Sequence, residues 1–288
     1  MNKRVTLLSN IKKDIPESEL SKIIEKLSSL GCTVYVSSDD NRQIFSMFTN
    51  IEKRAQDELF DGTDFIVVAG GDGSMLEAAR LSAGSGIPLI GINFGRLGYL
   101  AELEVGELVL LEKVVSGDYK IEERMMLDVE IDREGHIQRL NSPCLNETVF
   151  SNAPISRLAS FDLYCNGEAA LKYKADGIIV STPTGSSAYS LSAGGPLVYQ
   201  TMKCIIVTPI CAHSFMQRPV VFTDDCIIEV KNASCRENKL FITVDGRDNI
   251  EIFSSDIIRI KKSDLTTKLI RVKEGGFINN LYGKLGNN

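Results

Sequence analysis

Residues 64 to 74 read Asp64-Phe65-Ile66-Val67-Val68-Ala69-Gly70-Gly71-Asp72-Gly73-Ser74, and they decide the fold. The run from Phe65 to Ala69 is apolar at every position, which is typical of a central parallel strand that is buried on both faces. The glycines that follow predict a tight turn, and residues 74–82 predict a helix. Strand, turn and helix in this order indicate an α/β domain built on a parallel sheet.

The segments on either side of this unit repeat its pattern. Upstream, the apolar spacing predicts strands at 5–8 and 33–36, with a helix between them that begins near Glu17. We expect a further helical stretch over 45–59. Downstream, the break Gly84-Ser85-Gly86 leads into a strand over 87–92. The alternation predicts a Rossmann-like domain, in which ligands bind at the carboxyl ends of the strands.

The pattern changes near Arg124 to short strands of alternating polarity. Asn166-Gly167 lies between two such strands and predicts a tight hairpin, because both turn positions need positive φ. The predicted fold class is therefore α/β plus β, with an N-terminal Rossmann-like α/β domain followed by a β-rich, β-sandwich-like domain. We place these domains at 1–122 and 123–264.

The C-terminal residues 265–288 are predicted to return to the first domain. Phe277, Leu281 and Leu285 share one face of a possible helix in this tail, and such a face is expected to dock rather than stay in solvent.

Composition narrows the functional classes. The chain has 288 residues, 43% of them hydrophobic, and a formal net charge of -6, which argues against non-specific binding of nucleic acid. The N-terminal apolar run is too short for a signal peptide or a membrane span, so we expect a cytoplasmic protein without a membrane partner. Seven scattered cysteines without a Cys-x-x-Cys pair suggest free thiols, and two histidines are too few for a His-based metal centre.

The turn after the buried strand has the chemistry of a phosphate site. Gly70, Gly71 and Gly73 let backbone amides approach phosphate oxygens closely, and the N-terminus of the following helix adds partial positive charge. Asp72 is unfavourable beside bound phosphates unless it holds Mg²⁺, accepts a hydroxyl proton, or does both. The alternative is a plain Asp-Gly turn without chemistry.

Other nucleotide and hydrolase motifs do not fit the chain. It has no Gly-x-x-x-x-Gly-Lys-Ser/Thr loop, and Leu76 occupies the third glycine position of Gly-x-Gly-x-x-Gly. A Gly-x-Ser-x-Gly elbow is also missing from the sequence. A P-loop enzyme, an ordinary dehydrogenase and a serine hydrolase of the elbow type are therefore disfavoured.

Two further segments carry dense polar chemistry. Residues 176–196 form a hydroxyl-rich block punctuated by glycine, which offers hydrogen bonds to a ribose, an adenine or a phosphate, although such composition is also common in ordinary loops. Asn146-Glu147 interrupts a strand-like segment, and this pair either reads a base edge or ribose hydroxyls, or faces solvent. The basic residues Arg157, Lys172 and Lys174 could offset the charge of a pyrophosphate.

Taken together, four segments resemble the NAD kinase family in order and spacing across most of the chain. They are Gly70-Gly71-Asp72-Gly73, the run Gly91-Ile92-Asn93-Phe94-Gly95-Arg96-Leu97-Gly98-Tyr99-Leu100, Asn146-Glu147, and the block 176–196. The turn alone is less specific, because diacylglycerol and sphingoid lipid kinases and phosphofructokinases resemble it there. The block 176–196 is the discriminating segment.

The resemblance implies a transfer of the γ-phosphoryl group of ATP to the 2′-hydroxyl of the adenosine ribose of NAD, giving NADP. It implies that Asp72 accepts the proton and that the active site lies in the cleft between the domains. Mg²⁺ or another divalent cation would arrive with ATP, without a protein metal site of its own. NAD and ATP are then the ligands, and a homodimer or homotetramer is expected.

The resemblance also assigns contacts with NAD. They fall on Asp72, Gly73, Asn146, Glu147, Arg157, Lys174, Asp176, Thr184, Ser187, Ala188, Tyr189, Ser190, Leu191, Ser192 and Asp245. The ring of Tyr189 either stacks on the ligand or packs in the core. Two alternatives for the whole protein stay open at this point, namely a lipid kinase that shares the glycine turn and a module that binds NAD without catalysis.

Overall fold

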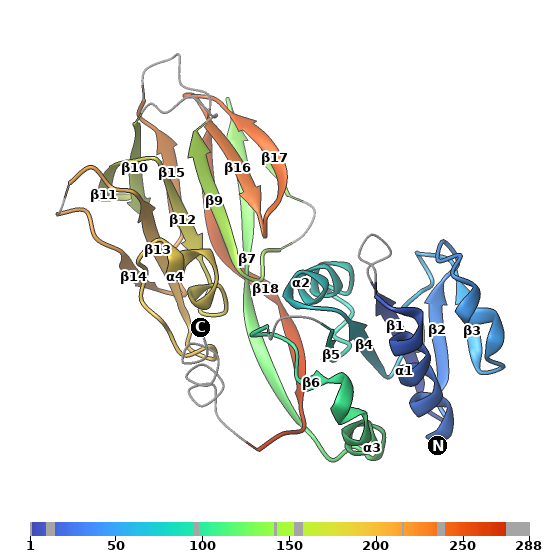
Figure 1. Cartoon of the computed structure of the whole chain (residues 1–288). Coiled ribbons are helices and arrows are strands. Elements are labelled where there is room, and N and C mark those ends of the chain that lie inside the picture. The colour runs from blue at the N-terminus through green and yellow to red at the C-terminus, as the bar shows by residue number, and fades with distance from the viewer. Residues whose placement is uncertain are drawn as a thin grey trace. The chain divides into compact units, whose positions relative to one another are not determined.

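A computed structural model describes residues 2–9, 15–94, 98–140, 143–152, 158–214, 216–234 and 240–274 (Figure 1). The chain divides into two compact units. The first comprises Met1–Glu123 together with the chain from Thr267 onward, and the second comprises Arg124–Thr266. A compact unit need not fold independently. The domains 1–122 with 265–288, and 123–264, therefore stay a proposal.

A parallel sheet forms the centre of the first unit. Its strands follow the order β5, β4, β1, β2, β3, and the end of β18 and the short β6 also pair with β5. The chain order reverses at β1, which lies between β2 and β4, and open α/β sheets bind ligands beside such a reversal. The strands are β1 (Arg4–Ser9), β2 (Thr33–Ser37), β3 (Ile51–Arg54), β4 (Phe65–Ala69), β5 (Leu89–Asn93), β6 (Leu103–Glu104) and β18 (Ile257–Arg271).

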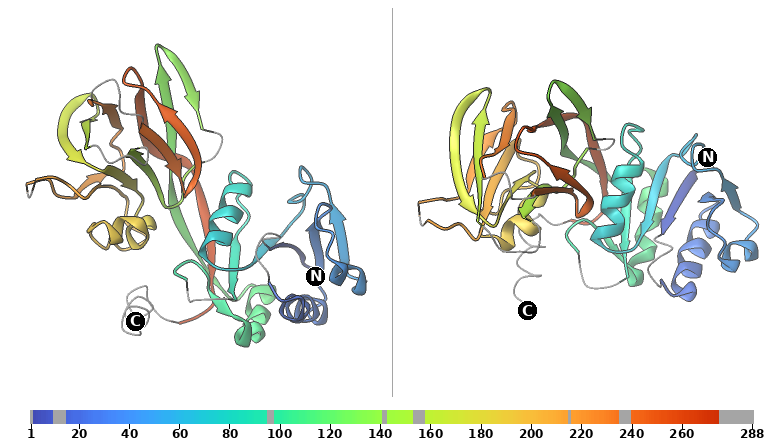
Figure 2. Two further views of the ribbon diagram at one scale, coloured as in Figure 1. Left: turned by 45° about the horizontal axis from the view of Figure 1, so that its top comes forward. Right: turned by 90° about the horizontal axis from the view of Figure 1, so that it is seen from above.

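Helices cover both faces of this sheet (Figure 2). On one face, α1 (Glu17–Ser29) and α3 (Leu111–Ser116), which follows the 3₁₀ helix η2 (Val105–Leu110), bury apolar side chains against alternate strand residues such as Val5 and Leu7. On the other face lies α2 (Asp72–Leu81). Gly91 of β5 permits its close approach, because a Cβ there would stand 2.6 Å from Sδ of Met75.

The predicted helical stretch over 45–59 is wrong. The structure has a 3₁₀ helix, η1 (Gln43–Met47), followed by β3, which pairs in parallel with β2 and places Ile51 opposite Val34. Pairing with β2 satisfies the backbone groups of this segment, and Arg54 stacks over the ring of Tyr35 at 3.5 Å from its centroid. These non-local contacts override the local pattern of the sequence.

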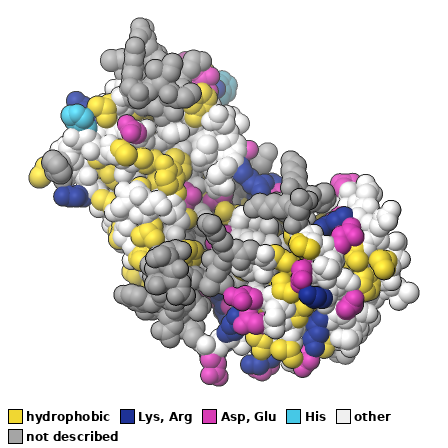
Figure 3. Space-filling view, in the orientation of Figure 1, with side chains coloured by type: hydrophobic (Ala, Val, Ile, Leu, Met, Phe, Trp, Pro, Cys, Tyr) yellow, Lys and Arg dark blue, Asp and Glu magenta, His cyan; other side chains and the backbone are white. Residues whose placement is uncertain are grey.

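Charged side chains of both signs are interspersed on the face of the first unit seen in Figure 3. Ion pairs join Lys26 to Glu112 at 2.5 Å and Lys273 to Glu107 at 2.5 Å. Among the described residues, no helix has the length and hydropathy needed to cross a membrane.

The second unit consists of two sheets packed face to face. One sheet combines β18 with β7 (Lys120–Arg133), β8 (His136–Arg139), β10 (Ala159–Cys165), β11 (Glu168–Ala175) and β15 (Ile228–Asn232). The other contains β9 (Glu147–Asn152), β12 (Gly177–Ser181), β13 (Cys204–Ile210), β14 (Val220–Thr223), β16 (Leu240–Val244) and β17 (Arg247–Ile252). Phe150 and Phe161 meet edge to face between the sheets, with ring centroids 6.5 Å apart. The predicted fold class is confirmed.

Local features of the second unit also follow the sequence. Asn166 and Gly167 both have positive φ, at 53° and 83°, and they join β10 to β11 as a hairpin. A 3₁₀ turn, η3 (Gly185–Ser187), and the short helix α4 (Tyr189–Ser192) interrupt the strands of this unit.

The chain returns to the first unit at the end of β18. Leu269 pairs with Leu89 of β5, and the guanidinium of Arg271 binds Glu102 and Glu122, each at 3.0 Å. The predicted docking face of Phe277, Leu281 and Leu285 lies outside the described residues.

Candidate functional site

The glycine turn connects the carboxyl end of β4 to α2. Gly70 has φ of 147°, and a Cβ at this position would stand 2.2 Å from Oγ of Ser74. Gly71 precedes the helix, and Asp72 is its first residue. Backbone and helix start therefore come together at the edge of the sheet, as a phosphate-binding turn requires.

The carboxylate of Asp72 is held by the backbone of a second segment. It accepts hydrogen bonds from the N–H groups of Tyr99 at 2.8 Å and Leu100 at 3.0 Å, one on each oxygen. Gly98 passes so close that a Cβ there would lie 2.0 Å from Oδ1 of Asp72. Each oxygen has a second lone pair, so the fixed carboxylate can still accept a proton or bind a cation.

The sequence did not assign a role to Gly98. The available signal was its place in the glycine-punctuated run 91–100, which the resemblance had already singled out. Because no side chain distinguishes one glycine of such a run from another, only the close approach to Asp72 identifies the one that matters.

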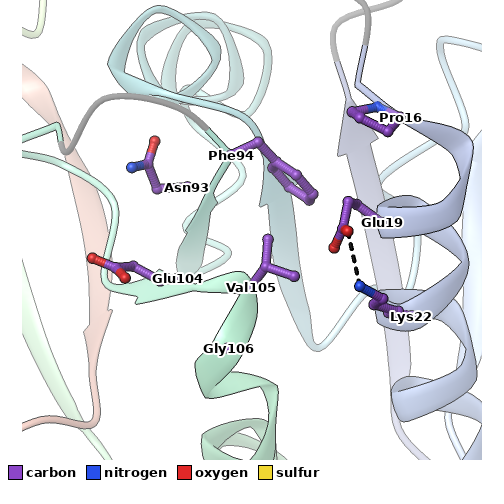
Figure 4. A pocket seen from close by; sticks show the side chains of 8 residues that line it. All are labelled: Pro16, Glu19, Lys22, Asn93, Phe94, Glu104, Val105 and Gly106. Carbon is purple, nitrogen blue, oxygen red and sulfur yellow. Dashed lines mark hydrogen bonds and ion pairs between the residues drawn. The ribbon is translucent and has the colours of Figure 1, made fainter.

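A cavity of about 610 Å³ opens between the start of α1 and the start of η2, at the end of β5 (Figure 4). Asn93 lies on its wall, with Oδ1 at 3.7 Å from the place of a Cβ on Gly71. Glu19 of α1 binds Lys22 at 2.8 Å through one oxygen, while its other oxygen, Oε2, is buried without a hydrogen-bond partner among the described residues. This hollow suits a ligand group that donates hydrogen bonds, such as a hydroxyl or an amino group.

In the second unit, Asp245 organises the segment that carries Asn146 and Glu147. Its carboxylate accepts the N–H groups of Leu145 at 2.8 Å, Asn146 at 2.8 Å and Glu147 at 3.1 Å, and the thiol of Cys144 donates to it at 3.3 Å. Burial, the charge of Asp245 and this hydrogen bond raise the pKa of Cys144 well above its usual value. These bonds make Asp245 an anchor for the backbone of Leu145, Asn146 and Glu147.

Asn146 and Glu147 present buried acceptors. Oδ1 of Asn146 and Oε2 of Glu147 have no hydrogen-bond partner among the described residues. Burial, followed by the charge of Asp245, raises the pKa of Glu147 to about 7, while a hydrogen bond from the backbone N–H of Tyr189 lowers it. Buried acceptors without partners are costly, so this pair favours a ligand that brings donors.

The hydroxyl-rich block packs directly on that pair. Thr182 donates its N–H to the carbonyl of Asn146 at 2.9 Å and its hydroxyl to the carbonyl of Leu145 at 2.6 Å. A Cβ on Gly185 would stand 2.2 Å from the carbonyl oxygen of Asn146, so glycine is needed for this contact.

Arg124 supports the block through its side chain, and no motif of the sequence singles this residue out. Its guanidinium is fully buried and donates to Oγ1 of Thr184 at 3.2 Å and to Oε1 of Gln200 at 2.5 Å. Thr184, a predicted ligand contact, is therefore itself buried and already bonded.

The predicted contacts within 187–192 divide into two groups. The hydroxyls of Ser187 and Ser190 are buried and bond to the carbonyl of Thr184 at 3.1 Å and to Oγ1 of Thr208 at 2.8 Å. Ala188 and Leu191 are half-buried, and Ser192 is exposed.

Tyr189 is 44% exposed and does not pack in the core. With Ser192 it lines a cavity of about 490 Å³, whose other wall includes Cys211 and Arg218. Its ring face is therefore accessible for stacking.

Lys174 and Asp176 are exposed at the end of β11. Backbone hydrogen bonds tie them to the neighbouring chain, from the N–H of His213 to the carbonyl of Lys174 at 2.9 Å and from the N–H of Asp176 to the carbonyl of Ile210 at 3.0 Å. Arg157 lies outside the described residues. The structure thus gathers most of the predicted contacts within the second unit and the turn within the first.

Comparison with known proteins agrees with these two sets of residues. Residues 5–119 match the family model described as the ATP-NAD kinase N-terminal domain, and residues 145–272 match that of the ATP-NAD kinase C-terminal domain. The chain belongs to the NAD kinase family. This membership confirms the resemblance and decides against a lipid kinase that shares only the turn.

Individual relatives support the family along the whole chain. The NAD kinase of Caldanaerobacter subterraneus subsp. tengcongensis is 38% identical over 98% of this chain and 99% of its own length. That of Acetivibrio thermocellus is 35% identical over 98% of this chain and 96% of its own.

Solved structures share the fold. An NAD kinase from Archaeoglobus fulgidus in complex with ATP has a TM-score of 0.76 and 26% identity, covering 99% of both chains. A yeast NADH kinase in complex with NADH has a TM-score of 0.89 and 24% identity, covering 100% of this chain and 88% of that chain. Because the identity is this low, the match supports the fold alone.

Proposed function

We propose that the protein transfers the γ-phosphoryl group of ATP to the 2′-hydroxyl of the adenosine ribose of NAD and so makes NADP. The observation that carries this proposal is the carboxylate of Asp72, fixed by two backbone amides at the end of a phosphate-binding turn. A ribose hydroxyl is a poor nucleophile, and a positioned carboxylate that takes its proton while the new P–O bond forms lowers the barrier.

The second unit provides the proposed NAD site. Oδ1 of Asn146 and Oε2 of Glu147 would accept hydrogen bonds from ribose hydroxyls or the adenine amino group, because both atoms are buried and lack other partners among the described residues. Tyr189 offers a ring face, and Lys174 offers a cation for the pyrophosphate. Gly73, Arg157, Asp176, Ala188, Leu191 and Ser192 complete the proposed contacts, while Asp245, Thr184, Ser187 and Ser190 would hold the shape of the site.

The residues fit a divalent cation that arrives with ATP. Among the described residues, no group of three or more His, Cys, Asp and Glu side chains could hold a metal ion by itself. Mg²⁺ in nucleotide enzymes is held by one or two carboxylates together with substrate phosphates, and Asp72 at the glycine turn supplies such a carboxylate. When bound, the cation would neutralise charge that develops on the phosphates.

Location and assembly remain proposals from the sequence and the family resemblance. We propose a cytoplasmic protein that forms a dimer or a tetramer. Cell fractionation and sedimentation velocity would test them, and a membrane-associated or strictly monomeric protein would contradict them.

The decisive experiment compares the wild type with Asp72→Asn. Purified protein is incubated with ATP, Mg²⁺ and NAD, and NADP is measured with an NADP-specific dehydrogenase. We expect NADP from the wild type and a loss of rate of about 10²-fold or more in Asp72→Asn, with NAD binding retained, because the amide cannot accept the proton.

Three results would contradict parts of the proposal. Absence of NADP with every donor tried would reject the kinase, and nucleotide binding without turnover would favour a module that only binds NAD. Equal rates for the two proteins would remove Asp72 from the mechanism.

A further inference from the structure

A partly buried arginine lies at the carboxyl edge of the parallel sheet, in a segment to which no motif draws attention. Arg42 follows β2, and its side chain is only 17% exposed. Nε of Arg42 donates to Oδ1 of Asp40 at 2.9 Å, and Nη2 bonds to Oδ2 of the same carboxylate. Asp40 is itself buried, so the guanidinium is fixed in one orientation.

The second contact of Arg42 places it beside the phosphate-binding turn. Nη2 also donates to Oγ of Ser9, the last residue of β1. Ser9 is the register partner of Ala69, the last residue of β4, and Gly70 comes next. Adjacent strands lie about 4.8 Å apart, so the guanidinium is roughly 10 Å from the start of the turn.

A second cation and an unused guanidinium nitrogen lie at this edge. Nζ of Lys53, on β3, donates to the backbone carbonyl of Asp40 at 2.9 Å, whereas the carboxylate of Asp40 is bound by Arg42. Among the described residues, Nη1 of Arg42 makes no hydrogen bond, since the bonds to Asp40 and Ser9 use Nε and Nη2. This nitrogen therefore has donors available for an anion.

We propose that Arg42 binds the triphosphate chain of the phosphoryl donor, in the stretch that extends from the glycine turn across the end of β1. Asp40 and Ser9 hold the guanidinium in place, and Lys53 adds to the positive potential. An ion pair that only stabilised the loop would not need an available guanidinium nitrogen at this edge. The inference rests on the proposed use of ATP, and it assigns a binding role rather than a part in the proton transfer.

The test measures donor and acceptor binding separately. Calorimetric titration with MgATP in the absence of NAD gives the donor affinity directly, and steady-state assays give KM for ATP and for NAD. In Arg42→Gln we expect the Kd and KM for ATP to rise roughly 10- to 100-fold, the worth of one charge-assisted contact, while KM for NAD stays within about twofold. Inhibition by inorganic tripolyphosphate should weaken by a similar factor, because the contact is to phosphate.

Arg54→Gln is the matched control. It removes one positive charge from β3 of the same sheet, but its guanidinium stacks on Tyr35 and donates to the carbonyl of Asp61 at 2.8 Å. We expect its ATP affinity to stay within about twofold of the wild type. An equal loss in both variants would show a general charge effect and overturn the assignment.

Other outcomes are equally decisive. Unchanged ATP affinity in a folded Arg42→Gln protein, or parallel increases in KM for ATP and NAD, would reduce Arg42 to a structural role. If that variant does not fold, hydrogen exchange on the wild type replaces it, and MgATP or tripolyphosphate must slow exchange in residues 40–43 or the inference fails. A wild type that binds MgATP but makes no NADP would reject the kinase function without touching this inference.

Discussion

Asp245→Asn should weaken both the fold of the second unit and the binding of NAD. Asparagine tolerates the positive φ of 47° at this position, so the backbone turn itself should survive. The substitution removes the charge and replaces one carboxylate oxygen with an N–H donor. One of the backbone amides held by Asp245 would then face a donor in place of an acceptor.

The expected loss can be built up bond by bond. The amide left without its acceptor costs about 1 to 3 kcal/mol, and loss of charge assistance in the two other backbone bonds costs about 1 kcal/mol each. Relief of repulsion with Glu147 returns about 1 kcal/mol, since Asp245 is one cause of the raised pKa of Glu147. The net change is about 2 to 4 kcal/mol in the free energy of unfolding.

Urea unfolding followed by circular dichroism measures this change, and the NADP assay gives KM for NAD. We expect a lower midpoint and a raised KM for NAD, because Asn146 and Glu147 lose the anchor of their backbone. Asp248→Asn is the matched control, with the same substitution at an exposed residue whose φ is 54°. A loss below about 1 kcal/mol with unchanged KM would refute the positioning role of Asp245.

Gly98→Ala should lower kcat by about 10²-fold, because the added Cβ would lie 2.0 Å from Oδ1 of Asp72 and displace the proposed base; the NADP assay measures it. Glu147→Gln should change how stability depends on pH. In the wild type, the pKa of Glu147 is about 7 in the folded state and 4.5 in the unfolded state. The folded state therefore binds more protons between pH 4.5 and 7. The contribution of Glu147 to stability is full below pH 4.5 and is lost as the pH rises through 7. Urea unfolding from pH 5 to 8 should show a loss on the order of 3 kcal/mol that the variant lacks.

Each of these predictions has a control. Gly106→Ala adds a Cβ with nothing within 4 Å and should keep wild-type kcat, so an equal loss in both alanine variants would exclude displacement of Asp72 as the cause. For Glu147, Glu168→Gln changes an exposed carboxylate of the same unit and should leave the pH profile intact. Identical profiles for the wild type and Glu147→Gln would show that Glu147 titrates normally.

The sequence by itself determined the architecture of the two units and the identity of the family. A strand that is apolar on every side can only be central, the glycine turn must follow it at the sheet edge, and Asn166-Gly167 specifies a hairpin through its need for positive φ. These signals are local, and each depends on residues adjacent in the chain. The segment 45–59 was predicted wrongly because its outcome depends on pairing with β2, which lies elsewhere in the sequence. The placement of the active site in a cleft between the domains stays a prediction.

Only the tertiary structure decided which residues hold the proposed site residues in place. Gly98 is one glycine among several in the sequence, and its closeness to Asp72 results from a backbone that returns after 26 residues. Asp245 and Arg42 likewise act on segments distant in the chain, through amides and hydroxyls that carry no sequence signature. Local patterns specify strands and turns, whereas the roles of these residues arise from contacts that exist only after folding.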